Sequence, residues 1–168
     1  DQSDLQDKIL VNVGSGREAL ALMQFNPKKI YHYDINPIPV KKLNSLKSSI
    51  VSKQLHLGKQ KLDRKFDFIY ISGVIQHVKN YNYFLENVDQ YLNKNGKVFF
   101  RICRSGSFAW LIVEFLRKFI FEKNYLKKTV LKKYDNKPVS LYANIIDDLF
   151  VPNLYVFDTD RFISKLNN

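Results

Sequence analysis

The fold is decided by one stretch near the start of the chain, Lys8-Ile9-Leu10-Val11-Asn12-Val13-Gly14-Ser15-Gly16-Arg17-Glu18-Ala19. The apolar run over residues 8–13 predicts a buried strand, and the two glycines after it predict a tight turn into a helix. A second apolar run, over residues 29–33, ends at Asp34, 20 residues after Gly14. This distance fits one helix and one strand, so the stretch predicts a strand–turn–helix–strand unit.

Such a unit is typical of a site for a nucleotide-type ligand. Glycines let the backbone approach a ligand closely, and a carboxylate at the end of the second strand can accept hydrogen bonds from two ribose hydroxyls. The alternatives need no ligand. Gly14 and Gly16 can form a plain strand-to-helix turn, and Asp34 can cap the helix that follows. Asp34 can have both roles only if they share its two oxygens.

Strands and helices alternate through the first hundred residues. The apolar spacing predicts helices over residues 17–25, 38–49 and 83–92 and strands over residues 8–13, 29–33, 54–57, 66–71 and 97–103. Asn95-Gly96 is predicted to stop the third helix. This alternation predicts a three-layer α/β fold, in which helices cover both faces of a doubly wound, mostly parallel sheet. Ligands of such sheets bind at the carboxyl ends of the strands, where Gly14, Asp34 and residues 72–77 fall.

The chain changes character after Ser107. Residues 108–121 form a very apolar helical stretch, and residues 117–137 hold eight basic residues and two acids. The apolar helix can be core, a lid over a substrate, a lipid-facing surface or a partner surface. A last helix is predicted after Asp158, with a buried face made of Phe162, Ile163 and Leu166.

Composition excludes several classes of protein. The single cysteine, Cys103, cannot form an intramolecular disulfide, and no apolar run reaches the roughly 18 residues of a membrane span. No secretory signal is evident, so we expect a cytoplasmic location. The three histidines and the cysteine show no metal-ligand spacing. The net charge of +11 fits nucleic acid, anionic lipid or an anionic small molecule, and it also fits a merely lysine-rich composition.

Four motifs, taken in order, resemble those of Rossmann-like, class I S-adenosylmethionine-dependent methyltransferases of the small-molecule type. Val11-Asn12-Val13-Gly14-Ser15-Gly16 is similar to their first motif, and Tyr33-Asp34-Ile35-Asn36-Pro37 to the acidic end of their second strand. Residues 66–78 resemble their fourth-strand segment, and residues 95–98 resemble the turn into their fifth strand. The resemblance extends over residues 8–166.

The resemblance implies S-adenosylmethionine as cofactor and methyl transfer to an oxygen or nitrogen of a small molecule. Both an anionic and a lipidic small molecule are open as substrates. The implied cofactor contacts lie at three strand ends: Asn12, Gly14, Ser15, Gly16, Asp34, Ile35, Ser72 and Gly73. The implied organisation is one domain, with a cofactor-binding core over residues 1–107, a substrate or lid insertion over residues 108–158 and a late helix over residues 159–168. The last two strands of the family are expected to be cut off or replaced.

The sequence departs from the family pattern at several places. The third glycine of the first loop is absent and is replaced near Glu18. The usual acid of the first motif is Asn12, whose amide brings no charge to the ammonium group of the cofactor. No clear acid follows the third strand, where Leu62 or Asp63 could substitute. His77 is the candidate base, because imidazole titrates near neutrality and can take a proton from a hydroxyl or amine. Its other interpretation is a residue that packs over the cofactor or caps the next helix.

Other functions stay open beside this one. The basic stretch over residues 117–137 suggests RNA as the acceptor, and Asn12 suggests a degenerate, non-catalytic scaffold. A nicotinamide-dependent dehydrogenase shares the first motif but needs a full three-glycine fingerprint, which the chain lacks. His32 and His56 fall in predicted strands and are interpreted as structural, as is Cys103 at the end of the fifth strand.

Overall fold

The computed structural model describes residues 2–46, 49–103, 105–106, 108–121, 151 and 153–166. Its centre is a five-stranded sheet with the strand order β3-β2-β1-β4-β5, and all four strand pairs are parallel. The strands are β1 (Ile9–Val13), β2 (Lys29–Asp34), β3 (Ile50–Gln54), β4 (Phe66–Ser72) and β5 (Leu92–Arg101). The predicted α/β fold with a parallel sheet is thereby confirmed.

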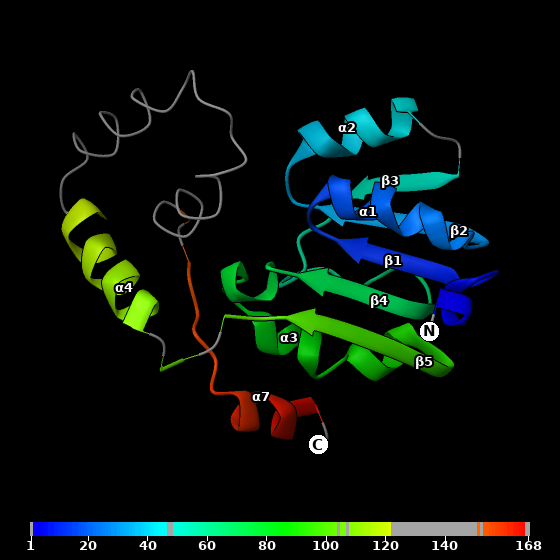
Figure 1. The fold of residues 1–168 in the computed structure, drawn as a ribbon. Helices are drawn as coiled ribbons and strands as arrows, with labels where there is room; N and C mark the ends of the chain where they lie inside the picture. Colours follow the sequence, from blue (N-terminus) through cyan, green and yellow to red (C-terminus); the bar gives the residue numbers. More distant parts are fainter. Residues whose placement is uncertain are drawn as a thin grey trace.

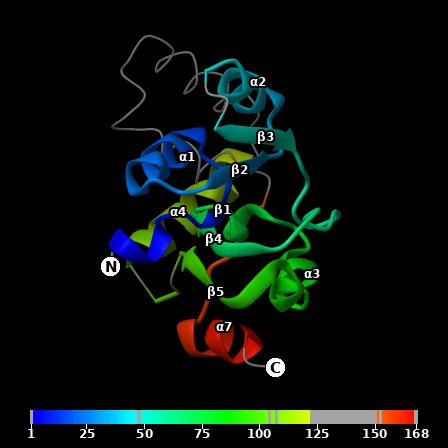
Figure 2. The same cartoon turned by 90° about the vertical axis from the view of Figure 1, so that its right-hand side faces the viewer.

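Helices cover both faces of this sheet, which gives three layers (Figures 1 and 2). One face carries α1 (Gly16–Leu22) and α2 (Pro37–Leu46), and the other carries α3 (Tyr81–Leu85) and α7 (Thr159–Leu166). Short 3-10 turns span Gln2–Leu5, Met23–Phe25, Ile75–His77 and Val88–Tyr91. The predicted doubly wound arrangement therefore holds for the described residues.

Side chains alternate along the strands, so each face of the sheet has its own apolar layer. On the face of α1 and α2, the register partners Leu10, Ile30 and Ile50 pack together. The next register position toward the carboxyl edge on this face is polar, since Asn12, His32 and Ser52 are partners there and all three are buried. The polar row thus lies between an apolar layer and the edge where ligands of such sheets bind.

The third strand was predicted at the wrong place. β3 is Ile50–Gln54, and the helix before it, predicted over residues 38–49, is Pro37–Leu46. The prediction placed the strand over residues 54–57 because Leu55 and Leu57 are apolar. These two leucines instead fill the core on the other face from a loop. Their burial in a loop has the same sequence signature as a short strand.

The fifth strand begins earlier than predicted. The helix expected over residues 83–92 is only the five-residue α3 and a 3-10 turn, and β5 starts at Leu92. Asn95 has a φ of 65° inside β5, where the pairing with β4 shifts between Phe66 and Phe68. Asn95-Gly96 is therefore a strand irregularity of the bulge kind and not a helix stop.

The chain returns to the sheet over residues 153–158, which we call the return segment. The N–H of Phe157 donates to the carbonyl of Cys103 at 2.9 Å, and the carbonyl of Phe157 accepts from Ser105 at 2.9 Å. The N–H of Tyr155 donates to the carbonyl of Gln76 at 2.8 Å. The return segment therefore joins the loop after β4 to the end of β5.

The late helix, α7, follows this segment. Asp158 Oδ1 accepts a hydrogen bond from the N–H of Arg161 at 2.9 Å, which is an N-cap contact. The Phe162 ring packs edge-on against Phe100 and Phe157, with centroid distances of 5.3 and 5.0 Å. The predicted buried face was wrong at Ile163, which is 49% exposed.

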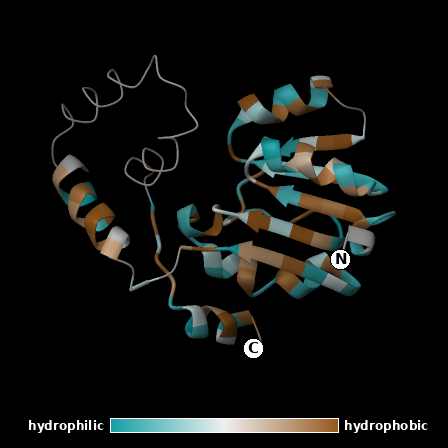
Figure 3. Cartoon of the chain, viewed as in Figure 1, coloured by the Kyte–Doolittle hydropathy of each residue, from teal (hydrophilic) through white to brown (hydrophobic). Residues whose placement is uncertain are grey.

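The apolar helix predicted over residues 108–121 is present as α4 (Phe108–Phe121) and lies beyond the carboxyl edge of the sheet (Figures 1 and 3). Its large exposed apolar side chains are Phe108, Leu111, Ile112, Phe115, Leu116 and Phe119. No described helix is long and apolar enough to cross a bilayer. The basic stretch over residues 117–137 and the insertion over residues 108–158 lie mostly outside the described residues.

Candidate functional site

Two glycine turns form the base of the candidate site. Gly14 follows β1 with a φ of 102°, and a Cβ there would lie 2.3 Å from Val74 Cγ2. Its N–H donates to the carbonyl of Tyr33 at 2.8 Å. Gly73 follows β4 with a φ of 68°. Both positions need a backbone that residues with a Cβ rarely adopt, and at Gly14 there is no space for one either.

The other predicted contacts of the first turn lie beside Gly14. Ser15 is exposed, and its hydroxyl makes no capping bond to α1. Gly16 begins α1, and a Cβ there would lie 3.0 Å from Leu43 Cδ1 of α2. Ile35, at the end of β2, is 60% exposed, and its carbonyl accepts from Gln54 Nε2 at 2.8 Å. The structure thus brings the first two motifs to one edge of the sheet.

Asp34 ends β2 and is half-buried. Its Oδ1 accepts from the N–H of Asn36 at 2.8 Å, while Asn36 Oδ1 accepts from the N–H of Ile38 at 3.0 Å. Because α2 starts at Pro37, Asn36 is the capping residue and Asp34 is not. Burial raises the pKa of Asp34, against the opposing effects of the Asn36 bond and of His32.

Buried polar atoms without a hydrogen-bond partner gather near the glycine turns. In the described part of the chain they are both carboxamide atoms of Asn12, Oε2 of Glu18, the hydroxyl of Ser72 and Oε1 of Gln76. Two further atoms of this kind belong to the β3–β4 connection and to the turn before β5, in His56 and Tyr91. A buried polar group left unpaired costs about 1–3 kcal/mol, so such a group needs an explanation. A polar ligand at the carboxyl edge of β1 and β4 would supply one.

His32 was interpreted as structural, and it contacts the first glycine turn. Its ring is fully buried, with Nε2 2.5 Å from the carbonyl oxygen of Gly14 and Nδ1 2.6 Å from Ser52 Oγ. The sequence did not indicate the contact between His32 and Ser52, because the strand that holds Ser52 was predicted at other residues. Glu18 and Gln76 were missed for another reason, since only the structure shows that Oε2 of Glu18 and Oε1 of Gln76 are buried without a hydrogen-bond partner.

His77 lies at the end of the 3-10 turn after β4 and is half-buried. Its Nδ1 is 3.0 Å from the carbonyl oxygen of Asn153 in the return segment. A carbonyl only accepts, so Nδ1 carries the proton and Nε2 is the atom that a base would use. The catalytic role of His77 stays a prediction.

The two residues proposed to replace the missing acid after the third strand both contact other parts of the protein. Leu62 is buried in the core on the α3 face. Asp63 accepts hydrogen bonds from Tyr33 Oη at 2.5 Å, from Lys53 and from Arg64. Burial alone would raise the pKa of Asp63, but these bonds outweigh it and lower the pKa. Neither side chain is left for a ligand.

Two other residues lie outside the strands in which they were predicted. His56 follows β3 in the connection to β4, because β3 ends at Gln54. Cys103 lies two residues beyond the end of β5 and is half-buried, and its Sγ accepts from Gln76 Nε2 at 3.2 Å. A structural role for Cys103 fits this contact. Arg104 and Ser107 lie outside the described residues.

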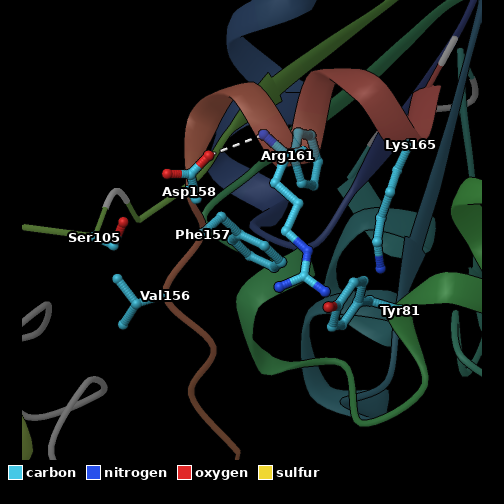
Figure 4. Close-up of a pocket in the computed structure, with 8 residues that line it drawn as sticks. Tyr81, Ser105, Val156, Phe157, Asp158, Arg161 and Lys165 are labelled. Carbon is cyan, nitrogen blue, oxygen red and sulfur yellow. Dashed lines mark hydrogen bonds between the residues drawn. The ribbon is translucent and has the colours of Figure 1, made fainter.

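A separate cavity of about 310 Å³ lies between α7, α3 and the return segment (Figure 4). It is lined by Tyr81, Ser105, Val156, Phe157, Asp158, Arg161, Phe162 and Lys165. Figure 4 shows the side chains of Arg161 and Lys165 extending toward Tyr81. Lys165 Nζ donates to Asn82 Oδ1 at 2.8 Å and lies 5.3 Å from the Tyr81 ring centroid. Arg161 makes backbone hydrogen bonds, since its N–H donates to Asp158 Oδ1 and its carbonyl accepts from Ser164 Oγ, both at 2.9 Å. Within the described residues, no hydrogen bond or ion pair of its guanidinium is found.

Comparisons with solved structures support the fold. PKMT2 from Rickettsia typhi matches with a TM-score of 0.67 and 17% identity, over 99% of this chain and 40% of that chain. PKMT2 in complex with AdoHcy matches similarly, with a TM-score of 0.64. N-methyltransferase NodS from Bradyrhizobium japonicum WM9, in complex with S-adenosyl-l-homocysteine, has a TM-score of 0.50 and 16% identity, over 56% of this chain and 52% of that chain.

Sequence comparison gives two matches of different extent. Truncated formate dehydrogenase 2 from Saccharomyces cerevisiae is 31% identical over 80 residues, which are 43% of this chain and 33% of that protein. The chain thus spans about a third of this curated relative and two fifths of PKMT2. The family described as "Methyltransferase domain" matches residues 3–130, which are most of the chain. The chain therefore belongs to the methyltransferase domain family and has the Rossmann-like fold of class I S-adenosylmethionine-dependent methyltransferases.

Proposed function

We propose that the chain binds S-adenosylmethionine at the carboxyl edge of β1, β2 and β4 and transfers its methyl group to a small molecule. The observation that carries the cofactor part is the group of buried, unpartnered polar atoms near the glycine turns. The methionine portion of the cofactor has an ammonium and a carboxylate, which offer the donors and acceptors that these atoms lack. When bound, the cofactor supplies an electron-poor methyl group on a sulfonium sulfur.

The residues of β1 and β2 have distinct roles in this proposal. Gly14 and Gly16 let the backbone approach the ligand, and Gly73 does the same from the end of β4. Asp34 accepts a ribose hydroxyl on the oxygen that the Asn36 turn does not use. The exposed Ile35 side chain offers an apolar contact for the adenine ring. Ser15 and Ser72 complete the polar lining.

Glu18 supplies the negative charge that Asn12 lacks. Its Oε2 is buried and has no partner in the described residues, and it lies in the first turn of α1, directly after the glycine turn. Burying a carboxylate is unfavourable unless a cation or donor compensates it. The cationic groups of the cofactor fit this requirement. The sequence alone did not indicate this role, because Glu18 occupies the place of an expected glycine.

The cavity beside α7 is the proposed acceptor site. Its volume of about 310 Å³ fits a small molecule and lies at the lower end of the range for ligand pockets. The guanidinium of Arg161 and the aromatic ring of Tyr81 fit an acceptor that has an anionic group and an apolar body. Tyr155 links the return segment to Gln76, next to the proposed cofactor site. RNA is the alternative acceptor, and the basic stretch that suggests it lies mostly outside the described residues.

Catalysis in this proposal depends mainly on position. The side chains hold the acceptor atom in line with the methyl group of the cofactor. Methyl transfer then proceeds as an effectively unimolecular step between two oriented groups. His77 takes the proton of the acceptor on Nε2, while the bond from Nδ1 to Asn153 keeps its ring in place.

Isothermal titration calorimetry with S-adenosylmethionine, S-adenosylhomocysteine and NAD⁺ tests the cofactor. We expect micromolar binding of the first two compounds and loss of that binding in Asp34→Asn. This variant keeps the oxygen that accepts from Asn36, so the turn into α2 stays intact. Asp89→Asn is the matched control, because Asp89 is an exposed residue of the 3-10 turn before β5.

The outcomes separate the competing functions. Binding of NAD⁺ in place of the two methionine derivatives would overturn the proposal in favour of a dehydrogenase-like domain. Binding of the cofactor with no methyl transfer to any of a panel of small-molecule anions would favour the scaffold. Absence of all three bindings would reject a nucleotide-type site in this chain.

A further inference from the structure

We infer that His32 is the positioning residue of the first glycine turn: it holds the Gly14 carbonyl and so orients the Gly14–Ser15 peptide for the cofactor. The inference rests on the proposed function, because it assumes that this turn contacts a ligand. No role of this kind follows from the motif itself, which ends at Gly16.

The proton positions of His32 follow from its two partners. Nε2 is 2.5 Å from the Gly14 carbonyl oxygen, which can only accept, so Nε2 carries the proton. In a neutral ring Nδ1 is then the acceptor, and the Ser52 hydroxyl, 2.6 Å away, donates to it. Both ring nitrogens of the buried His32 side chain therefore have a defined partner and direction.

Ser52 is itself held firmly. Asn44 of α2 brackets its backbone, because Nδ2 donates to the Ser52 carbonyl and Oδ1 accepts from the Ser52 N–H, both at 2.9 Å. A continuous hydrogen-bonded line therefore runs from Asn44 through Ser52 and His32 to Gly14. It connects α2, β3 and β2 to the turn after β1. The bond between Ser52 and His32 is buried, and buried hydrogen bonds are rigid when every member is satisfied.

Residues of β2 bind both the N–H and the carbonyl of Gly14 and so orient the turn. Adjacent residues of β2 hold Gly14, since Tyr33 accepts from its N–H and His32 donates to its carbonyl. The carbonyl of Gly14 and the N–H of Ser15 belong to one trans peptide and point in opposite directions. Fixing the carbonyl on His32 therefore aims the Ser15 N–H away from β2. Asn12, the register partner of His32 on β1, has its unpartnered carboxamide in the same polar row.

The charges around His32 favour its neutral form. Burial lowers the pKa of His32, against the opposing effects of the Gly14 bond and the Asp34 charge. Its sheet neighbours Asn12 and Ser52 are uncharged. The charged residues of the covering helices are Arg17 and Glu18 of α1 and Lys41 and Lys42 of α2, and both lysines are exposed. The ring therefore donates through Nε2 alone at neutral pH.

Three variants test the inference. His32→Leu removes the donor and keeps the apolar volume, whereas His32→Gln places an amide N–H near the position of Nε2. Ser52→Ala removes the partner of Nδ1 and leaves the Gly14 bond. We expect S-adenosylhomocysteine to bind about tenfold more weakly to His32→Leu and within about threefold of wild type to His32→Gln, since one hydrogen bond corresponds to roughly tenfold. Circular dichroism checks that each variant is folded.

Nitrogen-15 NMR of the histidine ring gives a readout that needs no ligand. The Nε2–H tautomer of His32 in the wild-type chain, together with a shifted Ser15 amide in His32→Gln and Ser52→Ala, would support the inference even where His32→Leu fails to fold. An Nδ1–H tautomer, or unchanged affinity in a folded His32→Leu, would overturn it. If wild type fails to bind S-adenosylhomocysteine, the proposed function fails, and the tautomer and the Ser15 amide still decide the role of His32.

Discussion

Gly14 is restricted in two ways, by its backbone and by its surroundings. Its φ of 102° is unfavourable for any other residue, and Val74 occupies the space of a Cβ. We expect Gly14→Ala to lower the free energy of unfolding by more than the roughly 1–3 kcal/mol of backbone strain alone. Gly106→Ala is the control, because Gly106 has a φ of 85° with no atom within 4 Å of a Cβ. Urea unfolding measures both, and equal losses would show that Val74 moves aside.

His32 makes stability depend on pH in a known direction. Its pKa in the folded chain is below the ordinary 6.5, so the unfolded chain binds the proton first as pH falls. The free energy of unfolding should therefore decrease as pH drops below about 6.5 and level off below the lowered pKa. The raised pKa of Asp34 acts oppositely, and only nearer its own ordinary value of 3.8. Urea unfolding at pH 7 and pH 5 should show a smaller decrease in His32→Gln than in wild type.

Glu18 tests the origin of the charge at the cofactor site. We expect Glu18→Gln to weaken S-adenosylmethionine binding by about tenfold, because the amide keeps the size and loses the charge that faces a cation. Glu86→Gln changes an exposed carboxylate after α3 and should leave the affinity unchanged. Calorimetry compares the two variants with wild type. Unchanged affinity in Glu18→Gln would mean that Asn12 and the backbone suffice.

At the scale of elements, α7 supplies the two cations of the acceptor cavity. Phenyl phosphate is a suitable probe, since it combines an anionic group with a ring that can lie on Tyr81 and Phe157. We expect its binding, followed by NMR titration, to be lost in Arg161→Gln and reduced in Lys165→Gln. Lys42→Gln on α2 keeps the same change in net charge at a distant exposed site. Equal weakening by all three variants would indicate general charge attraction instead of a site.

The order of the elements could be predicted because the strands β1, β2 and β4 carry apolar runs and lie between polar turns. The glycine turn and Asp34 were predictable for the same reason, since both lie directly after such runs. β3 could not be predicted, because Leu57 is buried and Leu55 partly buried in a loop, and their spacing resembles that of a short strand. That error also hid the pairing of Ser52 with His32. A hydrogen bond between strands depends on register, which short apolar runs do not specify.

At the scale of the whole molecule, the sequence could not show how the late segment meets the sheet. Asp158 and Phe162 indicated a helix start and a buried face, and α7 has both. The bonds from Phe157 to Cys103 and Ser105 join parts of the chain about fifty residues apart. Nothing in the local pattern of either part specifies the other, so this connection required the structure.

The return segment has a consequence for the order in which the molecule opens. Closing a loop of about fifty residues between Ser105 and Phe157 costs roughly 3–4 kcal/mol in chain entropy, and three backbone bonds with α7 packing must offset it. Native-state hydrogen exchange should therefore reveal a separate cooperative unit, in which the amides of Tyr155 and Phe157 exchange faster than that of Ile69 in β4. Equal protection would mean that the sheet and α7 unfold in one step. Faster exchange of Tyr155 and Phe157 would mean that the return segment and α7 detach reversibly from the sheet. Their detachment would expose the proposed acceptor cavity while the glycine turns stay folded.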